Sequence, residues 1–501
     1  MGVFQPSSLF SDGAVLCRGK EIRVFGAAEL PVTAVLENSR GELLGRDTAE
    51  SRDGRFLCVL PPQAAQTDCV LTLRCGGEIR ECRNVAIGDV FLANGQSNME
   101  LELQNADEGP DCIRNHSNTL VRYYNVPKCP RVGPETEQAN RDARWRTIAP
   151  GSGGDMSAVA YFFAMTIQRH TGVPVGIIDC YWGGTSISCW MREETLQGLA
   201  EGQRYLADYA EKTRGVTMAQ YLEKEAAFQQ AFDRWNQAVA ALREKEPGIG
   251  WPDINLRLGP CPWNPPAGPG SPYRPFGLEG TMLERVVPCA LTGVLFYQGE
   301  EDTARTERYE ELLTAYIFQL RRQFMDSTLP FLNVQLPMWI DANARDSFTW
   351  PRLRLAQQQA ASQVRHSGLA VLLDQGEYDN IHPTNKRVVG ERLALEARRV
   401  IYGEGDAEQA PRAESKYSRD GALHVALTQN VRLRDGGDTL LEIAGEDGVF
   451  YPAETEIRAR ELVLSHAAVP RPVQARYAWT DYAIVRLFGE NGLPLAPFWL
   501  K

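Results

Sequence analysis

The sequence lacks an apolar run long enough to span a bilayer, and its first residues carry neither the basic start nor the apolar core of a signal peptide. It also lacks a basic patch, and its 53 Lys and Arg are outnumbered by 64 Asp and Glu, which gives a formal net charge of -11. Such an acidic balance repels phosphate backbones and anionic lipid. We therefore expect a cytoplasmic protein that binds neither nucleic acid nor membranes.

Closely spaced cysteine pairs are absent from the sequence, and histidines are few. The chain has 11 cysteines, but no C-x-x-C pair and no cysteine after Cys289. This pattern fits neither a disulfide framework nor a zinc site, so we expect most of the thiols to be reduced and buried. The sequence has only 6 histidines, namely His116, His170, His366, His382, His424 and His466. Few residues can therefore serve as a general base.

The chain length predicts more than one domain, because 501 residues exceed what a single core usually organises. Residues 15–82 form short alternating segments between Gly, Asp and Pro turns, which predicts a β domain over residues 1–84. Short strand-like segments return near the end and predict a second β domain over residues 405–501.

The central residues 85–404 have a different pattern, in which buried strands alternate with amphipathic helices. Residues 85–93 form a nearly continuous apolar run, typical of a strand buried on both faces of a parallel sheet. The alternation predicts an α/β domain with a doubly wound, three-layer sheet. A segment of about residues 191–285 interrupts it, and we interpret this segment as an insertion of two long surface helices and a loop over one face of the sheet.

A serine directly follows the first buried strand, in the segment Asn-Gly-Gln-Ser-Asn-Met that contains Ser97. A tight turn there would hold the hydroxyl at the edge of the sheet, with backbone N–H groups facing a developing oxyanion. Met99 occupies the place of the second glycine in the G-x-S-x-G turn, which excludes that hydrolase pattern. On its own, the segment fits an ordinary Gly/Asn turn equally well.

Three further polar clusters follow other strands of the same sheet: Trp-Gly-Gly-Thr-Ser at 182–186, Tyr-Gln-Gly-Glu at 297–300 and Asp-Asn-Ile-His-Pro at 379–383. In an open α/β sheet these turns share one edge, where ligands bind. His382 is the only histidine at such a strand end, and Asp379 stands three residues before it, a spacing that lets a carboxylate reach the imidazole. Together these groups are the parts needed for acyl transfer.

In this order, the segments Gly-Asp-Val-Phe-Leu-Ala-Asn-Gly-Gln-Ser-Asn-Met, Trp-Gly-Gly-Thr, Tyr-Gln-Gly-Glu and Ile-His-Pro resemble the sialate O-acetylesterase branch of the SGNH (GDSL-like) hydrolases. The resemblance covers nearly the whole chain. It implies an SGNH three-layer α/β/α domain with a flavodoxin-like parallel sheet, flanked by β-sandwich-like regions at both ends.

The resemblance also implies the roles of the site residues. Ser97 is the expected nucleophile, His382 the general base, and the Ser97 N–H, the Gly184 N–H and the Gln298 amide the oxyanion donors. Asp379 is the expected acid, although many relatives have aspartate where Asn380 stands, so Asp374 or a backbone carbonyl stays open. Residues expected at the sugar pocket, each with a structural role equally open, are Gln96, Asn98, Trp190, Glu300 and Arg354. No metal or organic cofactor is expected.

The expected reaction is removal of O-acetyl groups from sialic acid, with 9-O-acetyl-sialate as the first choice. The expected partner is a small acetylated sugar, and the oligomeric state stays open. An esterase for acetylated xylan or other plant oligosaccharides is the alternative within enzymes. A non-catalytic carbohydrate-binding protein is the alternative from another class, and the joint presence of Ser97, Gln298 and His382 argues against it.

Overall fold

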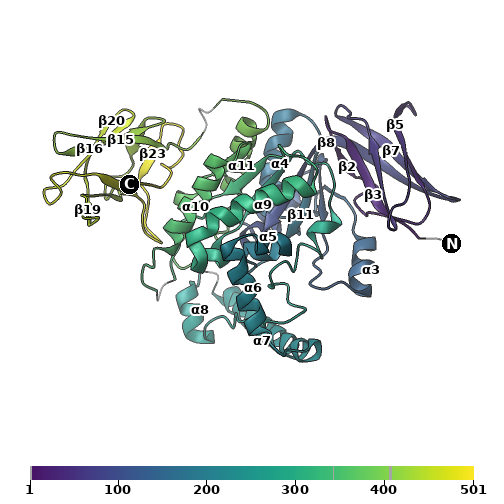
Figure 1. The fold of residues 1–501 in the computed structure, drawn as a ribbon, viewed down its shortest axis with the longest axis horizontal. Helices are drawn as coiled ribbons and strands as arrows, with labels where there is room; N and C mark the ends of the chain where they lie inside the picture. The colour runs from purple at the N-terminus through teal and green to yellow at the C-terminus, as the bar shows by residue number, and fades with distance from the viewer. Residues whose placement is uncertain (1–2, 247, 342–343, 406–408) are drawn as a thin grey trace.

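The computed structural model describes residues 3–246, 248–341, 344–405 and 409–501. Its centre is a parallel sheet of β8 (Glu78–Gly95), β9 (Asn118–Asn125), β11 (Val175–Tyr181), β12 (Gly293–Tyr297), β13 (Phe331–Val334) and β14 (Ser367–Ala370) (Figure 1). The strand order is β9-β11-β8-β12-β13-β14, with antiparallel β10 (Arg146–Ile148) beside β9. When β9 is set aside, the order is 2-1-3-4-5, which is the flavodoxin-like arrangement.

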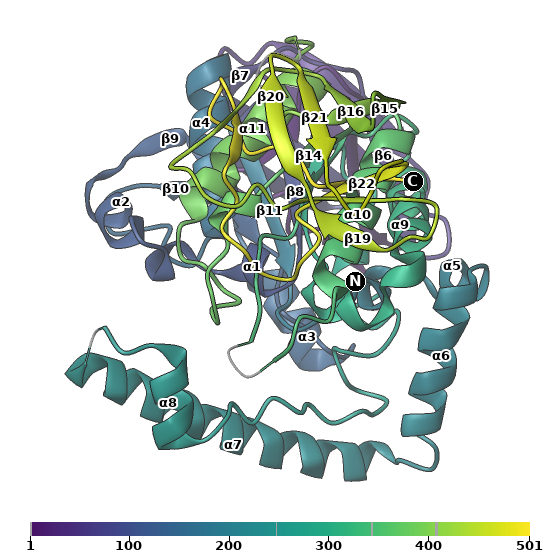
Figure 2. The ribbon, with the colours of Figure 1, turned by 90° about the vertical axis from the view of Figure 1, so that its left-hand side faces the viewer.

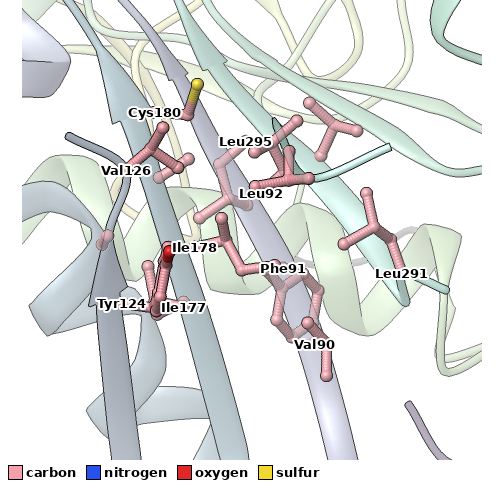
Figure 3. Close-up of a cluster of buried hydrophobic side chains, with 14 of the residues drawn as sticks. Val90, Phe91, Leu92, Tyr124, Val126, Ile177, Ile178, Cys180, Leu291 and Leu295 are labelled. Carbon is pink, nitrogen blue, oxygen red and sulfur yellow. The ribbon is translucent and has the colours of Figure 1, made fainter. Parts of the chain in front are cut away.

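The strands of this sheet are apolar because both of its faces are covered. Every residue of β11 and of β12 is buried. Side chains from neighbouring strands, such as Leu92, Ile178 and Leu295, form a continuous core (Figure 3). A strand with only one covered face would alternate between apolar and polar residues.

Helices cover both faces of the sheet, as the alternating side-chain directions along β8 show. Phe91 packs edge-on against Phe163 of α4 (Ala158–Thr171), with ring centroids 4.8 Å apart. Asn94 is three residues further and so points to the other face. There its Oδ1 accepts a 2.7 Å hydrogen bond from Tyr316 of α9 (Tyr309–Gln323). Since α11 (Lys386–Val400) packs on α4 and α10 (Thr349–Gln363) on α9, the three-layer prediction is confirmed.

The N-terminal region contains two sheets. One has the order β1-β3-β6, from β1 (Phe4–Pro6), β3 (Ile22–Ala28) and β6 (Arg55–Leu60). The other joins β2 (Val15–Cys17), β4 (Val32–Glu37), β5 (Leu43–Ala49) and β7 (Gln66–Cys75) to the first half of β8. Because β8 pairs with β7 in its first half and with β11 and β12 in its second, the predicted boundary between residues 84 and 85 lies inside one strand.

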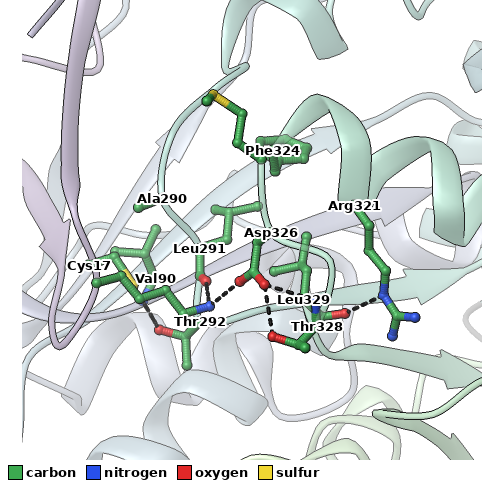
Figure 4. A network of polar contacts seen from close by, with 12 residues as sticks. Cys17, Val90, Ala290, Leu291, Thr292, Arg321, Phe324, Asp326, Thr328 and Leu329 are labelled. Carbon is green, nitrogen blue, oxygen red and sulfur yellow. Dashed lines mark hydrogen bonds and ion pairs between the residues drawn. The ribbon is translucent and has the colours of Figure 1, made fainter. Parts of the chain in front are cut away.

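Side chains also fix this region to the amino-terminal edge of the central sheet (Figure 4). The Lys20 ammonium lies 2.6 Å from Asp326 Oδ2 and donates to the carbonyl of Leu291 at 2.7 Å. Leu291 comes just before β12, and Asp326 lies in the turn before β13. The N-terminal region is therefore anchored at the edge opposite the strand-end clusters.

The C-terminal region forms further antiparallel sheets, with orders β15-β16-β21-β20, β19-β18-β22-β24 and β17-β23. Their strands are β15 (Ala413–Arg419), β16 (Ala422–Leu427), β17 (Val431–Leu433), β18 (Leu441–Ala444), β19 (Phe450–Pro452), β20 (Glu454–Arg458), β21 (Glu461–Ser465), β22 (Gln474–Tyr477), β23 (Leu487–Gly489) and β24 (Phe498–Leu500). A separate core fills this region and includes Met338, Val371 and Leu373 of the central domain. The predicted boundary at residue 405 is followed by residues 406–408, which lie outside the described part.

The insertion holds α5 (Glu193–Gln197), α6 (Ala200–Lys212), α7 (Met218–Lys245) and α8 (Trp251–Leu258). Helices α6 to α8 project from the central domain as an arm (Figure 2). Two long helices are thus present, as predicted, together with two shorter ones. Elsewhere the helices are α1 (Ser97–Glu100), α2 (Gly109–Asn115), α3 (Pro134–Asp142) and the 3-10 turns η1 (Leu103–Asn105), η2 (Ile187–Trp190), η3 (Leu283–Arg285), η4 (Glu300–Arg308) and η5 (Leu373–Gln375). Among the described residues, no helix has the length and apolarity to cross a membrane.

Candidate active site

Ser97 lies at the carboxyl edge of the sheet because β8 ends in a turn that requires glycine. Gly95 has a φ of 140°, and a Cβ there would stand 2.1 Å from the carbonyl oxygen of Tyr297 on β12. No other residue fits such a contact. The chain then turns into α1, whose first residue is the half-buried Ser97. Its position between β8 and β12 is the point where the strand order reverses, the usual ligand site of such sheets.

His382 reaches the same point from the loop that follows β14. Its Nε2 lies 2.8 Å from Ser97 Oγ, and its backbone N–H donates to Asn380 Oδ1 at 3.1 Å. Burial and, second, the ammonium of Lys386 lower the pKa of His382 to about 4. A neutral imidazole at this distance from a hydroxyl is placed to accept its proton.

Asp379 belongs to the same loop and has a backbone in the left-handed region, with a φ of 60°. Its N–H donates to the carbonyl of Ile340 at 3.1 Å. Within the described part of the chain, no hydrogen bond or ion pair joins its carboxylate to His382. The assignment of Asp379 as the acid therefore stays a prediction.

Backbone N–H groups gather near Ser97 from the loop after β11. A Cβ on Gly183 would lie 3.2 Å from the Cβ of Ser97, which brings this loop against the serine. The Gly183 N–H donates to Glu100 Oε2. Among the described residues, the N–H groups of Ser97 and Gly184 have no acceptor, so both are available to an oxyanion.

Gln298 differs from its expected role as an oxyanion donor. Its Nε2 lies 2.6 Å from the carbonyl of Thr185, 2.8 Å from Gln96 Oε1 and 3.0 Å from Asp302 Oδ2. An amide has two hydrogens, and three protein acceptors already compete for them. The side chain is fully buried and joins the loops after β8, β11 and β12.

The insertion reaches the site through Trp263, which is 39% exposed. Gly184 has a φ of 71°, and a Cβ there would stand 2.1 Å from the Trp263 ring. The ring also packs on Phe228 and Phe232 of α7 and on Tyr273. An aromatic wall from the insertion therefore borders one of the two free N–H groups.

The sequence was compared with known proteins. Residues 278–399 match the family described as carbohydrate esterase, sialic acid-specific acetylesterase. Sialate O-acetylesterases of Rattus norvegicus and Homo sapiens are each 24% identical over 96% of this chain, which covers 90% and 88% of their lengths. The crystal structure of a carbohydrate acetylesterase from Xanthomonas citri is 28% identical, with a TM-score of 0.77 over 100% of both chains.

The chain is a distant full-length homologue of the sialate O-acetylesterases. The resemblance drawn from the strand-end motifs is thereby confirmed. The matched family region, 278–399, contains the Tyr-Gln-Gly-Glu and Ile-His-Pro segments, whereas Ser97 lies outside it.

In this esterase homologue, the residues expected at the sugar pocket are buried instead. Exposed fractions are 3% for Gln96, 1% for Asn98, 0% for Trp190, 8% for Glu300 and 0% for Arg354. Gln96 accepts from Gln298, and the Trp190 indole donates to Thr185 Oγ1 at 3.2 Å. These side chains hold the loops of the candidate site in place.

Arg354 departs furthest from the expectation. Its guanidinium donates to the carbonyl of Pro337 at 3.1 Å and to that of Thr480 in the C-terminal region at 2.5 Å. Since these contacts lie within the protein and the side chain is fully buried, it cannot hold a substrate carboxylate. Its place is the junction of two regions.

Two buried charged residues of the site were missed in the sequence. Asp302 accepts from Gln298, from the Ile187 N–H at 3.0 Å and from the Tyr205 hydroxyl at 2.7 Å, and burial raises its pKa to about 6. Lys386 stands four residues after His382, on the apolar side of α11, and this unusual placement was the available signal. Among the described residues, no three His, Cys, Asp or Glu side chains are grouped to hold a metal.

Proposed function

We propose that the protein is a serine esterase that removes acetyl groups from carbohydrates. The observation that carries this proposal is the 2.8 Å contact between Ser97 Oγ and His382 Nε2 at the strand-order reversal of the sheet. A hydroxyl beside a neutral imidazole and two free N–H groups is suited to acyl transfer.

The proposed reaction has two steps. Ser97 Oγ gives its proton to His382 and attacks the acetyl carbonyl, while the Ser97 and Gly184 N–H groups stabilise the oxyanion. The C–O bond to the sugar breaks, and the sugar oxygen takes the proton from His382. Water then gives a proton to His382 and attacks the acetyl-serine, which releases acetate and returns the proton to Ser97. Asp379 is the proposed partner of the imidazole in both steps.

We propose O-acetylated sialic acid, with the ester at O9, as the first substrate. The names of the 24% identical relatives support this choice. Acetylated xylan or another plant oligosaccharide is the second candidate, because the 28% identical relative from Xanthomonas citri is described more broadly, as a carbohydrate acetylesterase. Arg354 gives no support for recognition of a sialic acid carboxylate, since its guanidinium donates to backbone carbonyls.

The decisive experiment compares the wild type with Ser97→Ala on p-nitrophenyl acetate. We expect the variant to lose at least about 10⁴-fold in kcat, because removal of a nucleophile leaves only binding and oxyanion contacts. Equal enzymatic rates would contradict the serine mechanism, and a wild type with no rate above the uncatalysed background would favour a carbohydrate-binding protein. Parallel rates on 9-O-acetyl-sialate and acetylated xylo-oligosaccharides then decide the substrate, and a strong preference for the xylan esters would overturn the first choice.

A further inference from the structure

A chain of three buried polar side chains runs beneath the Ser97–His382 pair. Lys386 Nζ donates to Asn98 Oδ1 at 2.5 Å, and Asn98 Nδ2 donates to Glu300 Oε1 at 2.6 Å. Lys386 is 1% exposed, and Asn98 and Glu300 are buried as well. A buried charge is costly unless it is compensated, and here one amide separates an ammonium from a carboxylate. The three residues therefore form one unit.

This unit contacts the chain next to both members of the pair. Asn98 directly follows Ser97, and its Nδ2 also donates at 2.9 Å to the carbonyl of Ile381, which directly precedes His382. Lys386 is the first residue of α11, the helix that follows the His382 loop. The turn of the nucleophile and the loop of the base are thus joined through the Asn98 amide.

Lys386 determines the orientation of that amide. The ammonium is a pure donor and must face the amide oxygen, whereas Glu300 and the Ile381 carbonyl must face the NH₂ group. Without the ammonium, Asn98 Oδ1 would be buried with one partner fewer. The amide could then rotate and lose its hold on the His382 loop.

We infer that Lys386 is a positioning residue for the esterase reaction, which fixes the Asn98 amide and thereby holds the Ser97 turn and the His382 loop in hydrogen-bonding register. The inference rests on the proposed function. Catalytic groups must be held within about 0.5 Å of their productive geometry, so a loosened amide affects the chemical step more than substrate binding.

Lys386 also acts on the imidazole through its charge. Glu300, Glu377 and Asp107 face its ammonium, and the Tyr297 ring centroid lies 5.5 Å from its Nζ. Burial lowers the pKa of Lys386 to about 7, so the ammonium is charged in the acid range where His382 titrates. Loss of this charge removes one of the two causes that lower the pKa of His382. The protonated, inactive imidazole would then form at a higher pH.

The test is Lys386→Met, followed by pH profiles of kcat/KM and kcat on p-nitrophenyl acetate. We expect kcat to fall by about tenfold to a hundredfold, with KM changed by less than about twofold, and the acid limb of kcat/KM to move to higher pH. Lys386→Arg restores the charge and should return the acid limb toward the wild-type position. Lys20→Met is the matched control, since it removes an ammonium at the opposite edge of the sheet and should leave the profile unchanged.

An active wild type whose Lys386→Met variant keeps both kcat and the acid limb would overturn the inference alone. A wild type without esterase activity would refute the proposed function and the inference with it. Circular dichroism and thermal unfolding check that each variant folds. If Lys386→Met does not fold, Lys386→Gln keeps a donor for Asn98 without the charge, and a wild-type acid limb in that variant also overturns the inference.

Discussion

The low pKa of His382 predicts an esterase that stays active in mild acid. The test lowers the pH from about 7.5 to about 5, a value below the ordinary histidine pKa of about 6.5. With a pKa of about 4, roughly nine in ten imidazoles are still neutral at pH 5, against about 3% for an ordinary histidine. Because only the neutral imidazole can accept the Ser97 proton, kcat/KM at pH 5 should be about 30-fold higher than an unperturbed histidine allows.

The assay measures initial rates on p-nitrophenyl acetate between about pH 4 and 8, read at the isosbestic wavelength of nitrophenol so that product ionisation does not distort them. The acid limb of the kcat/KM profile gives the pKa of the base in the enzyme without substrate, which is the state that the structure describes. Enzyme held at each pH and returned to pH 7.5 must recover full activity, which separates imidazole protonation from acid unfolding. An acid limb centred at pH 6.5 or above would refute the argument from burial and Lys386.

Three substitutions give further expected outcomes. Arg354→Met should lower the free energy of unfolding in urea by about 3 kcal/mol, because the carbonyls of Pro337 and Thr480 lose the guanidinium that donates to them. The kcat/KM of the folded enzyme should change little. Gly184→Ala should lower kcat by about 10²-fold, because a Cβ 2.1 Å from the Trp263 ring would displace the Gly184 N–H from the proposed oxyanion position. Adding Trp263→Ala to this variant should recover part of the loss. A fully active Gly184→Ala variant would contradict the role of the Gly184 N–H as an oxyanion donor. Asp379→Ala should lose about 10²-fold or more in kcat/KM on p-nitrophenyl acetate and Asn380→Ala little, and the reverse ranking would move the acid role elsewhere.

The sequence was sufficient for the architecture and for the meeting of Ser97 with His382. Buried strands have a distinct composition, and the rule that strand-end loops share one edge converts spacing along the chain into proximity. The predicted helices at both faces and the helical insertion follow from the same periodicity. None of these inferences required knowledge of a side-chain direction.

The roles of Gln298, Glu300 and Arg354 could not be predicted without knowing the direction of each side chain. A polar residue near a predicted site can face the ligand or brace the loops behind it, and the sequence pattern is the same in both cases. The difference depends on partners distant in the chain, such as Thr480 for Arg354 or Thr185 for Gln298. The unusual placement of Lys386 could be read from the sequence, but its partner could not, because Asn98 lies 288 residues away.

The continuity of β8 has a consequence for how this protein can be divided. Its 18 residues begin as a partner of β7 and end at the turn that presents Ser97. Removal of residues 1–77 would strip half of that strand of its neighbours and expose an unpaired edge, the kind of surface on which chains aggregate. The N-terminal region is therefore no detachable module that recombination could exchange at a linker. It has to be inherited, expressed and engineered together with the turn that carries Ser97.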